Sequence, residues 1–555
     1  MRVSYSAMRR TPSRFAAAAA FLSLAAACGG GGGGPTITVT VSPASTFAGV
    51  GQTQQFTATV VGATDTSVTW TVTEDLGGTI STGGLYTAPL LPGNFHVVAT
   101  SVADGSRNGT ATVSVVPPPA CTLETPQPSA LSLAQVLQLG VHTVGETVTF
   151  TVPASVGSVT IVQQGTEPLA PASVTYQGSL VANTVVPLTV KVDGVEFFND
   201  NVTPTGDDPA FWGTKNGIGS VFFDSASPWA GTMTVPNTTH MLQYVQDHGG
   251  VPAGTWSIVV NDYVEECRVL GPAKCVVGNG TLTYPPGKYD VKVLLKPGAV
   301  PAAGAVDVNF YLVTTQLTAA TASASASVAR MRQTLGTYLA RAGVTLGAVN
   351  YVDMPPEVKT RYAAGVDVDD SLPCGDVATV LRMSNAENAM SLFLVNSLVS
   401  NQGGAFTYVG IDGTIPGPSS VGGTVASGAL VSVANLGSGA ATACGGAVNL
   451  SGCGADRTAY IAAHETGHFL GLYHVTESDG VSFDPVQDTP TCKLSLCAPT
   501  STDVVNSNCT KFPADPASPC GGGENLMFWL FDSAYSTGTL STQQSGIMRA
   551  NPLVR

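Results

Sequence analysis

HETGHFLGLYH, residues 464–474 of the 555-residue chain, follows the pattern H-E-x-x-H-x-x-G-x-x-H. His464 and His468 are four residues apart, so on a helix they lie one turn above each other on the same face. Two imidazoles on one face can bind a single Zn²⁺ ion. Gly471 can adopt the left-handed conformation that ends a helix, which lets the chain turn back and brings His474 to the same ion. The pattern therefore predicts a zinc site with three histidine ligands and a fourth position open for water.

Glu465 follows the first histidine directly and lies at the edge of the metal-binding face. From there its carboxylate can accept a proton from a zinc-bound water and pass it to a leaving amine. Asp456 is the predicted N-cap of this helix. The alternative for a bare H-E-x-x-H pattern is an amphipathic helix whose histidines face solvent. Gly471 and His474 extend the pattern beyond what that alternative explains.

The extended pattern resembles the signature of the metzincin zinc proteases. Metzincins also carry a methionine-containing turn beneath the metal, and residues 524–529 (ENLMFW) are similar to that turn, with Met527 as its methionine. The segment Asp488-Thr489-Pro490 and four cysteines between the two motifs resemble the pappalysin and cytophagalysin branch. Many metzincins have a tyrosine two residues after the methionine, able to reach the metal. This chain has Trp529, whose indole N–H is only a donor and does not ligate zinc.

The resemblance implies an α/β catalytic domain over residues 301–555 that hydrolyses peptide bonds of extracellular proteins. Zn²⁺ would be held by His464, His468 and His474, with Glu465 as the catalytic base and Met527 supporting the site without ligating. Strands are predicted at residues 306–313, 349–352 and 392–395 and a helix at 322–342. By the resemblance, the Gly-rich stretch 403–439 contains an edge strand that borders the cleft and aligns a substrate peptide.

The acidic loop after the third histidine raises the question of a second ion. Asp479, Asp484 and Asp488 lie close together in the sequence. Carboxylate oxygens on a loop suit Ca²⁺, and members of the resembled family use calcium near this position, so Asp484 and Asp488 are candidate calcium ligands. Solvated loop carboxylates are the alternative.

The amino-acid composition limits the classes of partner that the chain can bind. Charged residues make up 11% of the sequence and the formal net charge is −14. Nucleic-acid binding needs a basic surface that neutralises phosphates, so this class of partner is excluded. Protein or peptide substrates remain the expected partners, and nothing in the sequence predicts an oligomeric state.

Residues 1–28 form a predicted lipoprotein signal peptide. Four arginines precede an apolar run that is too short to span a bilayer and suits a signal sequence. The run ends in Leu24-Ala25-Ala26-Ala27-Cys28, which resembles a bacterial lipobox. Lipidation of Cys28 would anchor an exported cell-envelope protein to a membrane through the flexible glycine tether 29–34. Simple secretion is the alternative.

Two all-β modules are predicted before the catalytic domain, so the fold class is multidomain. Residues 35–116 alternate apolar and polar positions between turn signals, which predicts a β-sandwich, and segments of it resemble bacterial immunoglobulin-like repeats. Residues 117–120 are a proline-rich linker. Residues 121–300 predict a second sandwich that resembles jelly-roll modules; it could bind substrate, assist folding or cover the active site.

Eleven cysteines are present, and setting Cys28 aside leaves an even number. Disulfides are the expected state in an exported chain, although the sequence does not fix their pairing. Two functions other than proteolysis stay open: a catalytically silent adhesin that uses its β-modules, and a surface- or glycan-binding lipoprotein with an incidental zinc site. The intact Glu465 favours the enzyme.

Overall fold

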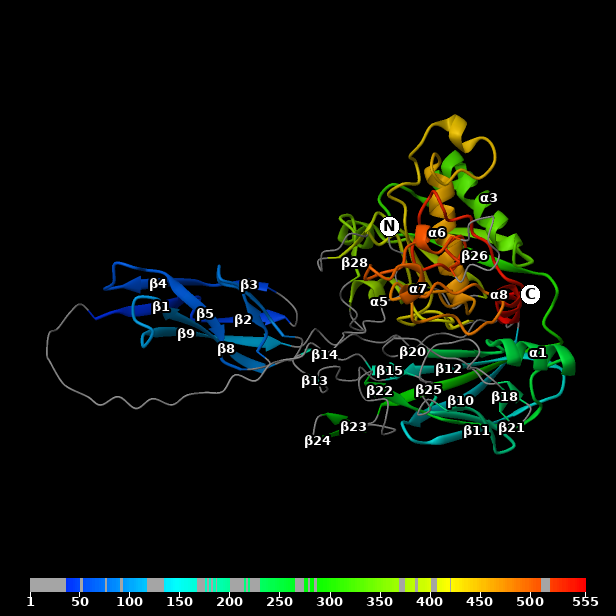
Figure 1. The fold of residues 1–555 in the computed structure, drawn as a ribbon, viewed down its shortest axis with the longest axis horizontal. Coiled ribbons are helices and arrows are strands. Elements are labelled where there is room, and N and C mark those ends of the chain that lie inside the picture. The colour runs from blue at the N-terminus through cyan, green and yellow to red at the C-terminus, as the bar shows by residue number, and fades with distance from the viewer. Residues whose placement is uncertain are drawn as a thin grey trace. The chain divides into compact units, whose positions relative to one another are not determined.

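Figure 1 shows the fold in a computed structural model. The structure describes residues 36–49, 53–74, 77–89, 93–116, 134–166, 175–176, 179–180, 183–185, 187–199, 214–215, 218–219, 230–264, 274–277, 280–283, 287–368, 375–384, 388–400, 407–419, 421–510 and 520–555. The predicted signal peptide, Cys28, the glycine tether and the proline linker lie outside these residues. The chain forms two compact units, one with residues 7–121 and 170–181 and the other with residues 122–169 and 182–555. They are called the N-terminal unit and the main unit.

The N-terminal unit is built from short strands whose residues alternate between the core and solvent. The pattern is clearest in β1, where Val39 and Val41 are buried between exposed threonines. Phe56 and Tyr86 meet edge to face in the core, and Trp70 packs at its border. The strands are β1 (Thr38–Ser42), β2 (Ser45–Gly49), β3 (Thr53–Gln55), β4 (Thr57–Val61), β5 (Val68–Val72), β6 (Thr79–Ile80), β7 (Leu85–Thr87), β8 (Gly93–Ser101) and β9 (Asn108–Val116). β2-β9-β8-β5 form the largest sheet, beside β1-β4 and β3-β7-β6.

The first part of the main unit contains two four-stranded sheets, here called the central sandwich. One sheet has the order β10-β25-β12-β20 and the other β11-β21-β16-β17. Trp256 is fully buried between them beside Phe150 and Phe197. The bounds are β10 (Gln135–Thr143), β11 (Thr147–Val152), β12 (Val156–Gly165), β16 (Thr189–Val192), β17 (Val195–Asn199), β20 (Ala230–Val235), β21 (Gly254–Val259) and β25 (Lys288–Pro297), with helix α1 (Thr239–His248) after β20.

Short two-stranded ribbons are also found in the described part of the chain; the first named below belongs to the N-terminal unit and the other three to the main unit. They pair β13 (Thr175–Tyr176) with β14 (Ser179–Leu180), β15 (Asn183–Val185) with β22 (Asp262–Val264), β18 (Thr214–Lys215) with β19 (Ile218–Gly219), and β23 (Lys274–Val277) with β24 (Gly280–Thr283). Both β-rich parts agree with the predicted all-β modules.

The rest of the main unit, residues 304–555, is built on a five-stranded sheet in the order β27-β26-β29-β32-β31. The first four strands are parallel, and β31 pairs with β32 antiparallel at the edge. Side chains of β26 alternate: Phe310 joins the core with α3 and α6, and Tyr311 stacks on Phe393 in the core on the other face. The bounds are β26 (Gly304–Leu312), β27 (Val344–Asp353), β28 (Val366–Asp367), β29 (Met390–Val395), β30 (Leu398–Val399), β31 (Gly410–Asp412) and β32 (Ala429–Ser432).

The helices of this region follow the predicted order with two corrections. The helix predicted over 322–342 is interrupted at Ser325, which ends α2 and caps α3 through its side chain. Asp456 is not the N-cap of the zinc-motif helix; Cys453 precedes the first turn, and Asp456 is buried inside that turn. The bounds are α2 (Ala319–Ala324), α3 (Ala326–Ala340), α4 (Pro356–Arg361), α5 (Asp376–Leu381), α6 (Gly454–Phe469), α7 (Leu494–Cys497) and α8 (Thr542–Ala550), with 3-10 turns at Ala441–Cys444 and Asn506–Asn508.

Asp456 lies inside the first turn of α6 because its carboxylate binds side chains of α3. Its carboxylate accepts hydrogen bonds from Arg330 Nε at 2.7 Å, Arg330 Nη2 at 2.8 Å and Thr334 Oγ1 at 2.6 Å. The backbone amide of Asn449 donates a further bond. A buried carboxylate needs such partners, so this ion pair fixes the position of α6 on α3. Within the described residues, no helix is long and apolar enough to cross a membrane.

Candidate metal centre

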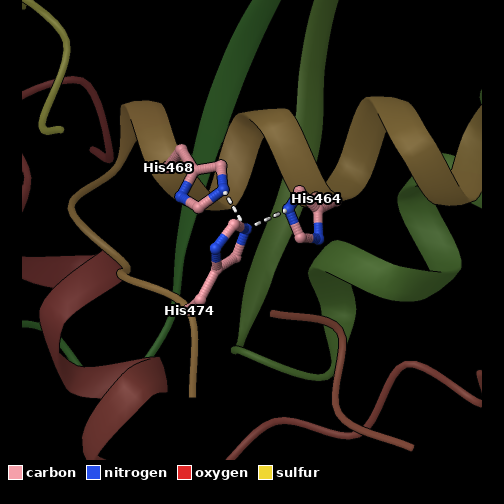
Figure 2. A group of neighbouring side chains, drawn as sticks. All are labelled: His464, His468 and His474. Atoms are coloured by element: carbon pink, nitrogen blue, oxygen red, sulfur yellow. Dashed lines mark hydrogen bonds between the residues drawn. The ribbon is translucent and has the colours of Figure 1, made fainter. Parts of the chain in front are cut away.

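Three histidine side chains converge at one point of the main unit (Figure 2). Nε2 of His474 lies 3.2 Å from Nε2 of His464 and 3.1 Å from Nε2 of His468. The first two ligand positions come from α6, and Gly471, with a φ of 110°, turns the chain so that His474 reaches them. Three nitrogens at about 2.0–2.1 Å from one tetrahedral ion are roughly 3.3 Å apart. The triad predicted from the sequence is therefore assembled with metal-ligand spacing.

Hydrogen bonds to the other ring nitrogens determine the tautomers. His464 Nδ1 lies 2.6 Å from the carbonyl oxygen of Leu526, and His468 Nδ1 lies 2.7 Å from that of Leu472. A carbonyl oxygen can only accept, so both Nδ1 atoms carry the proton and both Nε2 atoms present a lone pair. Lone pairs that face one another this closely repel unless a cation shares them. The donor set therefore fits a metal ion.

Burial keeps these imidazoles in the ligating form. It lowers the pKa of His464 and His468 well below the ordinary value, and the neighbouring histidines lower it further. Neutral imidazole is the form that binds a metal. The side chains of all three histidines are at most 2% exposed.

The third ligand is oriented by a residue that the sequence interpretation did not include. His474 Nδ1 lies 2.8 Å from Oε1 of Glu477, which is about one third exposed. Metal-binding histidines usually donate their second ring nitrogen to a carboxylate or a carbonyl. A glutamate three residues after the last ligand is a sequence signal that could have identified this partner.

Glu465 lies beside the triad and against the edge strand β31. It is 1% exposed, and its Oε1 has no hydrogen-bond partner among the described residues. A Cβ atom at Gly410 would come within 2.2 Å of this oxygen, so only glycine lets the carboxyl group lie against the strand. Burial raises the pKa of Glu465 well above its ordinary value, and the charge of Asp412 raises it further.

Asp412 was not identified from the sequence. It ends β31 two residues after Gly410, on the same face of the strand. Burial raises its pKa to about 7, although backbone amides at Asp412 and Thr414 act in the opposite direction. An isolated aspartate in a glycine-rich stretch carries no signal that its charge will act on Glu465.

The methionine turn lies under the zinc-motif helix, as expected from the resemblance. Met527 is fully buried, and its Sδ lies 2.5 Å from where a Cβ of Gly467 would be, so the helix needs glycine there. The Leu526 carbonyl of this turn accepts the hydrogen bond from His464. Trp529 donates its indole N–H to the carbonyl of Val504 at 2.8 Å.

The acidic loop does not form a comparable cluster. Asp484 is buried and accepts a hydrogen bond from Thr489 Oγ1 at 2.6 Å, and burial raises its pKa well above the ordinary value. Asp488 accepts from the backbone amide of Gln543 at the start of α8. Asp479 binds the amides of its own turn. Among the described residues, the histidine triad is the group of three or more His, Cys, Asp or Glu side chains that lies close enough together to hold a metal ion.

Disulfides close the segment between the third histidine and the methionine turn. Cys492 pairs with Cys509 and Cys497 with Cys520. A third bridge joins Cys444 to Cys453 at the start of α6. Cys267 lies outside the described residues. The predicted disulfides are thus present around the metal centre.

A scan against protein-family models finds no match, and a search of curated proteins finds no similar chain.

Proposed function

We propose that this chain is a zinc-dependent endopeptidase of the metzincin type. One observation carries the proposal: Nε2 of His474 lies within 3.2 Å of Nε2 of both His464 and His468, beside a buried carboxylate that has one oxygen without a hydrogen-bond partner in the described chain. Imidazole ligands suit zinc, copper, iron and nickel. A three-histidine set with an adjacent glutamate is the arrangement that zinc hydrolases use.

In this proposal, His464, His468 and His474 hold Zn²⁺. When bound there, the ion lowers the pKa of a coordinated water toward about 7 and polarises the scissile carbonyl. Glu465 accepts the proton of the attacking water and delivers it to the leaving amine nitrogen. Its buried position raises its pKa, which favours holding the proton between the two transfers.

The edge of the five-stranded sheet supports the same activity. β31 is the last strand of the sheet among the described residues, and it is antiparallel to its neighbour. An edge strand offers backbone groups that pair with an extended peptide. Because Gly410 brings Glu465 against this strand, a peptide paired there would have its backbone next to the base.

The location of the protein is part of the proposal. We propose an exported cell-envelope protein, anchored through a lipid on Cys28, with secretion as the alternative. The disulfides around the metal centre support an oxidising compartment, where such bonds persist. Substrates would be extracellular proteins or peptides. A calcium ion at Asp484 and Asp488 is not part of the proposal, since both carboxylates have protein donors.

The test compares residues 29–555 with a Glu465→Gln variant of matched zinc content on a mixed peptide library. The proposal expects cleavage by the unmodified protein and a loss of at least about a hundredfold in the variant, the scale of a general base. Equal cleavage by both would show that Glu465 is not the base. Zinc binding without cleavage by either protein would favour the silent adhesin.

A further inference from the structure

One sheet of the central sandwich is covered on both faces. Every residue of β12 and β20 is buried, including the threonines of both strands and the adjacent glutamines Gln163 and Gln164 of β12. One face of the sheet packs on the sandwich core. On the other, Ser158 Oγ donates a 2.6 Å hydrogen bond to the carbonyl oxygen of Ala550, the last residue of α8. The second face therefore contacts the C-terminal end of the region that holds the metal centre.

Lys296 of β25 also makes polar contacts from this face, to the C-terminal end of α8 and the residues after it. Its Nζ donates to the carbonyl oxygens of Arg549 at 2.5 Å, Asn551 at 3.0 Å and Val554 at 2.6 Å. An ammonium group has three protons, so these three acceptors use all of them. The last carbonyls of a helix have no partners within the helix, and a lysine near them is stabilising. Lys296 thus caps α8 from outside its own region.

The other end of α8 is also held by the central sandwich. Thr239, the first residue of α1, donates from Oγ1 to Gln543 Oε1 at 2.5 Å and accepts from the amide of Gln487 at 2.8 Å. Leu242 of α1 lies beside Gly546. Helix α8 has nine residues, too few to be stable on its own in water. Ile547 and Met548 pack it on the core shared with α3 and α6, and the contacts with Lys296 and Thr239 hold its two ends.

Helix α8 in turn supports the methionine turn. Gln544 Oε1 accepts a hydrogen bond from Asn525 Nδ2 at 3.0 Å, and Asn525 Oδ1 accepts from the amide of Met527 at 2.8 Å. Leu526, between them, offers the carbonyl that fixes the tautomer and direction of His464. At its far end, Asn551 Nδ2 donates to the carbonyl of Phe469, where α6 ends. These hydrogen bonds, together with helix α8 itself, connect the sandwich to the histidine triad.

We propose that the central sandwich is a structural component of the metal centre, and that Lys296 is a positioning residue for it. Lys296, Ser158 and Thr239 fix α8, α8 fixes the methionine turn, and that turn orients His464. The sandwich is therefore not a removable cover or a spacer. This inference rests on the proposed function only in requiring that the triad binds a metal ion.

The test uses the full-length protein with Lys296→Met and, as a matched control, Lys292→Met. Lys292 lies on the same face of β25 and is also buried, but it pairs with Asp290 of its own strand and not with α8. Both variants lose a buried lysine, so both are expected to lower the melting temperature. Only Lys296→Met is expected to weaken zinc binding in a chelator competition, by about tenfold as for lost outer-shell support, and to change the visible spectrum of the Co²⁺-substituted protein.

A Lys296→Met protein that melts earlier but keeps the zinc affinity and Co²⁺ spectrum of the control would overturn the inference. If Lys296→Met does not fold, Thr239→Val, which removes one contact at the start of α8, decides the question by the same two readouts. Unmodified protein that binds neither zinc nor Co²⁺ would overturn both this inference and the proposed function. Normal metal binding without peptide cleavage would overturn the proposed function alone.

Discussion

The N-terminal unit and the central sandwich have the same kind of sequence and differ in what covers their sheets. In β1 the two valines are buried and the polar residues on either side of them are exposed. In β12 and β20 the residues between the apolar positions are just as polar, yet they are buried. Period-two alternation therefore shows which side of a strand faces its own core, but it does not show whether the polar side faces water or another part of the chain.

The charged residues show the same difference. In the N-terminal unit, the ion pair between Glu74 and His96 is 33% and 43% exposed. In the main unit, Lys296, Asp456 and Glu465 are buried, and the first two have a full set of partners from other elements. Buried charges are costly unless paired. Charge placement in the main unit thus serves to hold elements together, which the following predictions test.

The largest effect is expected from removing whole parts of the chain. A protein that begins at residue 121 lacks strands β1 to β9 of the N-terminal unit and is expected to keep its zinc affinity. A protein that begins at residue 301 loses the acceptor-bound Lys296 and exposes the apolar surface that the sandwich covers, so it is expected to aggregate without binding zinc. Circular dichroism and zinc titration measure both. Full zinc affinity in the 301–555 protein would show that the central sandwich is as separable as the N-terminal unit.

Much of the metal centre could be predicted because its spacing is local. The four-residue separation of His464 and His468 and the glycine at 471 follow from helix geometry alone. The strand predicted at 306–313 also follows from local pattern, and the structure has it as β26, Gly304–Leu312. Met527 was placed by resemblance to a family turn, and the structure has it beneath the helix, in contact with Gly467.

The rest depends on contacts between residues distant in the sequence. Aspartate is a residue type that favours the N-cap position. Asp456 instead lies inside the helix, where it pairs with Arg330, which is 126 residues away in the sequence. Asp412 and Lys296 have no neighbours in the sequence that mark them, because their surroundings come from other strands and helices. The roles of such residues follow from tertiary packing, which no local pattern contains.

Buried Asp412 and exposed Asp65 should give the two parts opposite pH dependence. Asp412 has a pKa of about 7 in the folded protein against 3.8 for an ordinary aspartate. Its contribution to stability is therefore fully present below about pH 3.8 and is lost as the pH rises through about 7. The difference corresponds to about 4 kcal/mol at 1.36 kcal/mol per pKa unit.

Urea unfolding of metal-free residues 121–555 at several pH values measures this loss of stability. The Asp412→Asn variant is expected to lack most of the decrease with rising pH. In the isolated 35–116 fragment, hydrogen bonds from the Ser67 side chain and amide lower the pKa of Asp65. Its contribution should be present above about pH 3.8 and lost as the pH falls. An Asp412→Asn variant with the pH profile of the unmodified protein would contradict the assignment.

The ion pair between Arg330 and Asp456 should contribute more than its counterpart in the N-terminal unit. Arg330→Met leaves the buried carboxylate of Asp456 without its charged partner, while Thr334 and the amide of Asn449 still donate. A loss of about 3 kcal/mol is expected. Glu74→Gln in the 35–116 fragment removes a part-exposed pair and should cost less than about 1 kcal/mol. Similar losses in the two urea titrations would refute this difference between the units.

The smallest effect concerns two glycines. Alanine at Gly467 places its Cβ 2.5 Å from Met527 Sδ, whereas nothing lies within 4 Å of the equivalent atom at Gly105 in the N-terminal unit. Overpacking costs about 1–3 kcal/mol, and alanine in a helix returns about 1 kcal/mol relative to glycine. Gly467→Ala is therefore expected to lose about 1 kcal/mol, and zinc affinity should fall because Met527 moves the carbonyl that orients His464. Gly105→Ala should change neither quantity. If the Met527 side chain instead rotates without moving its backbone, the Gly467→Ala protein will be slightly more stable and will bind zinc normally. Chelator competition on the two variants distinguishes these outcomes.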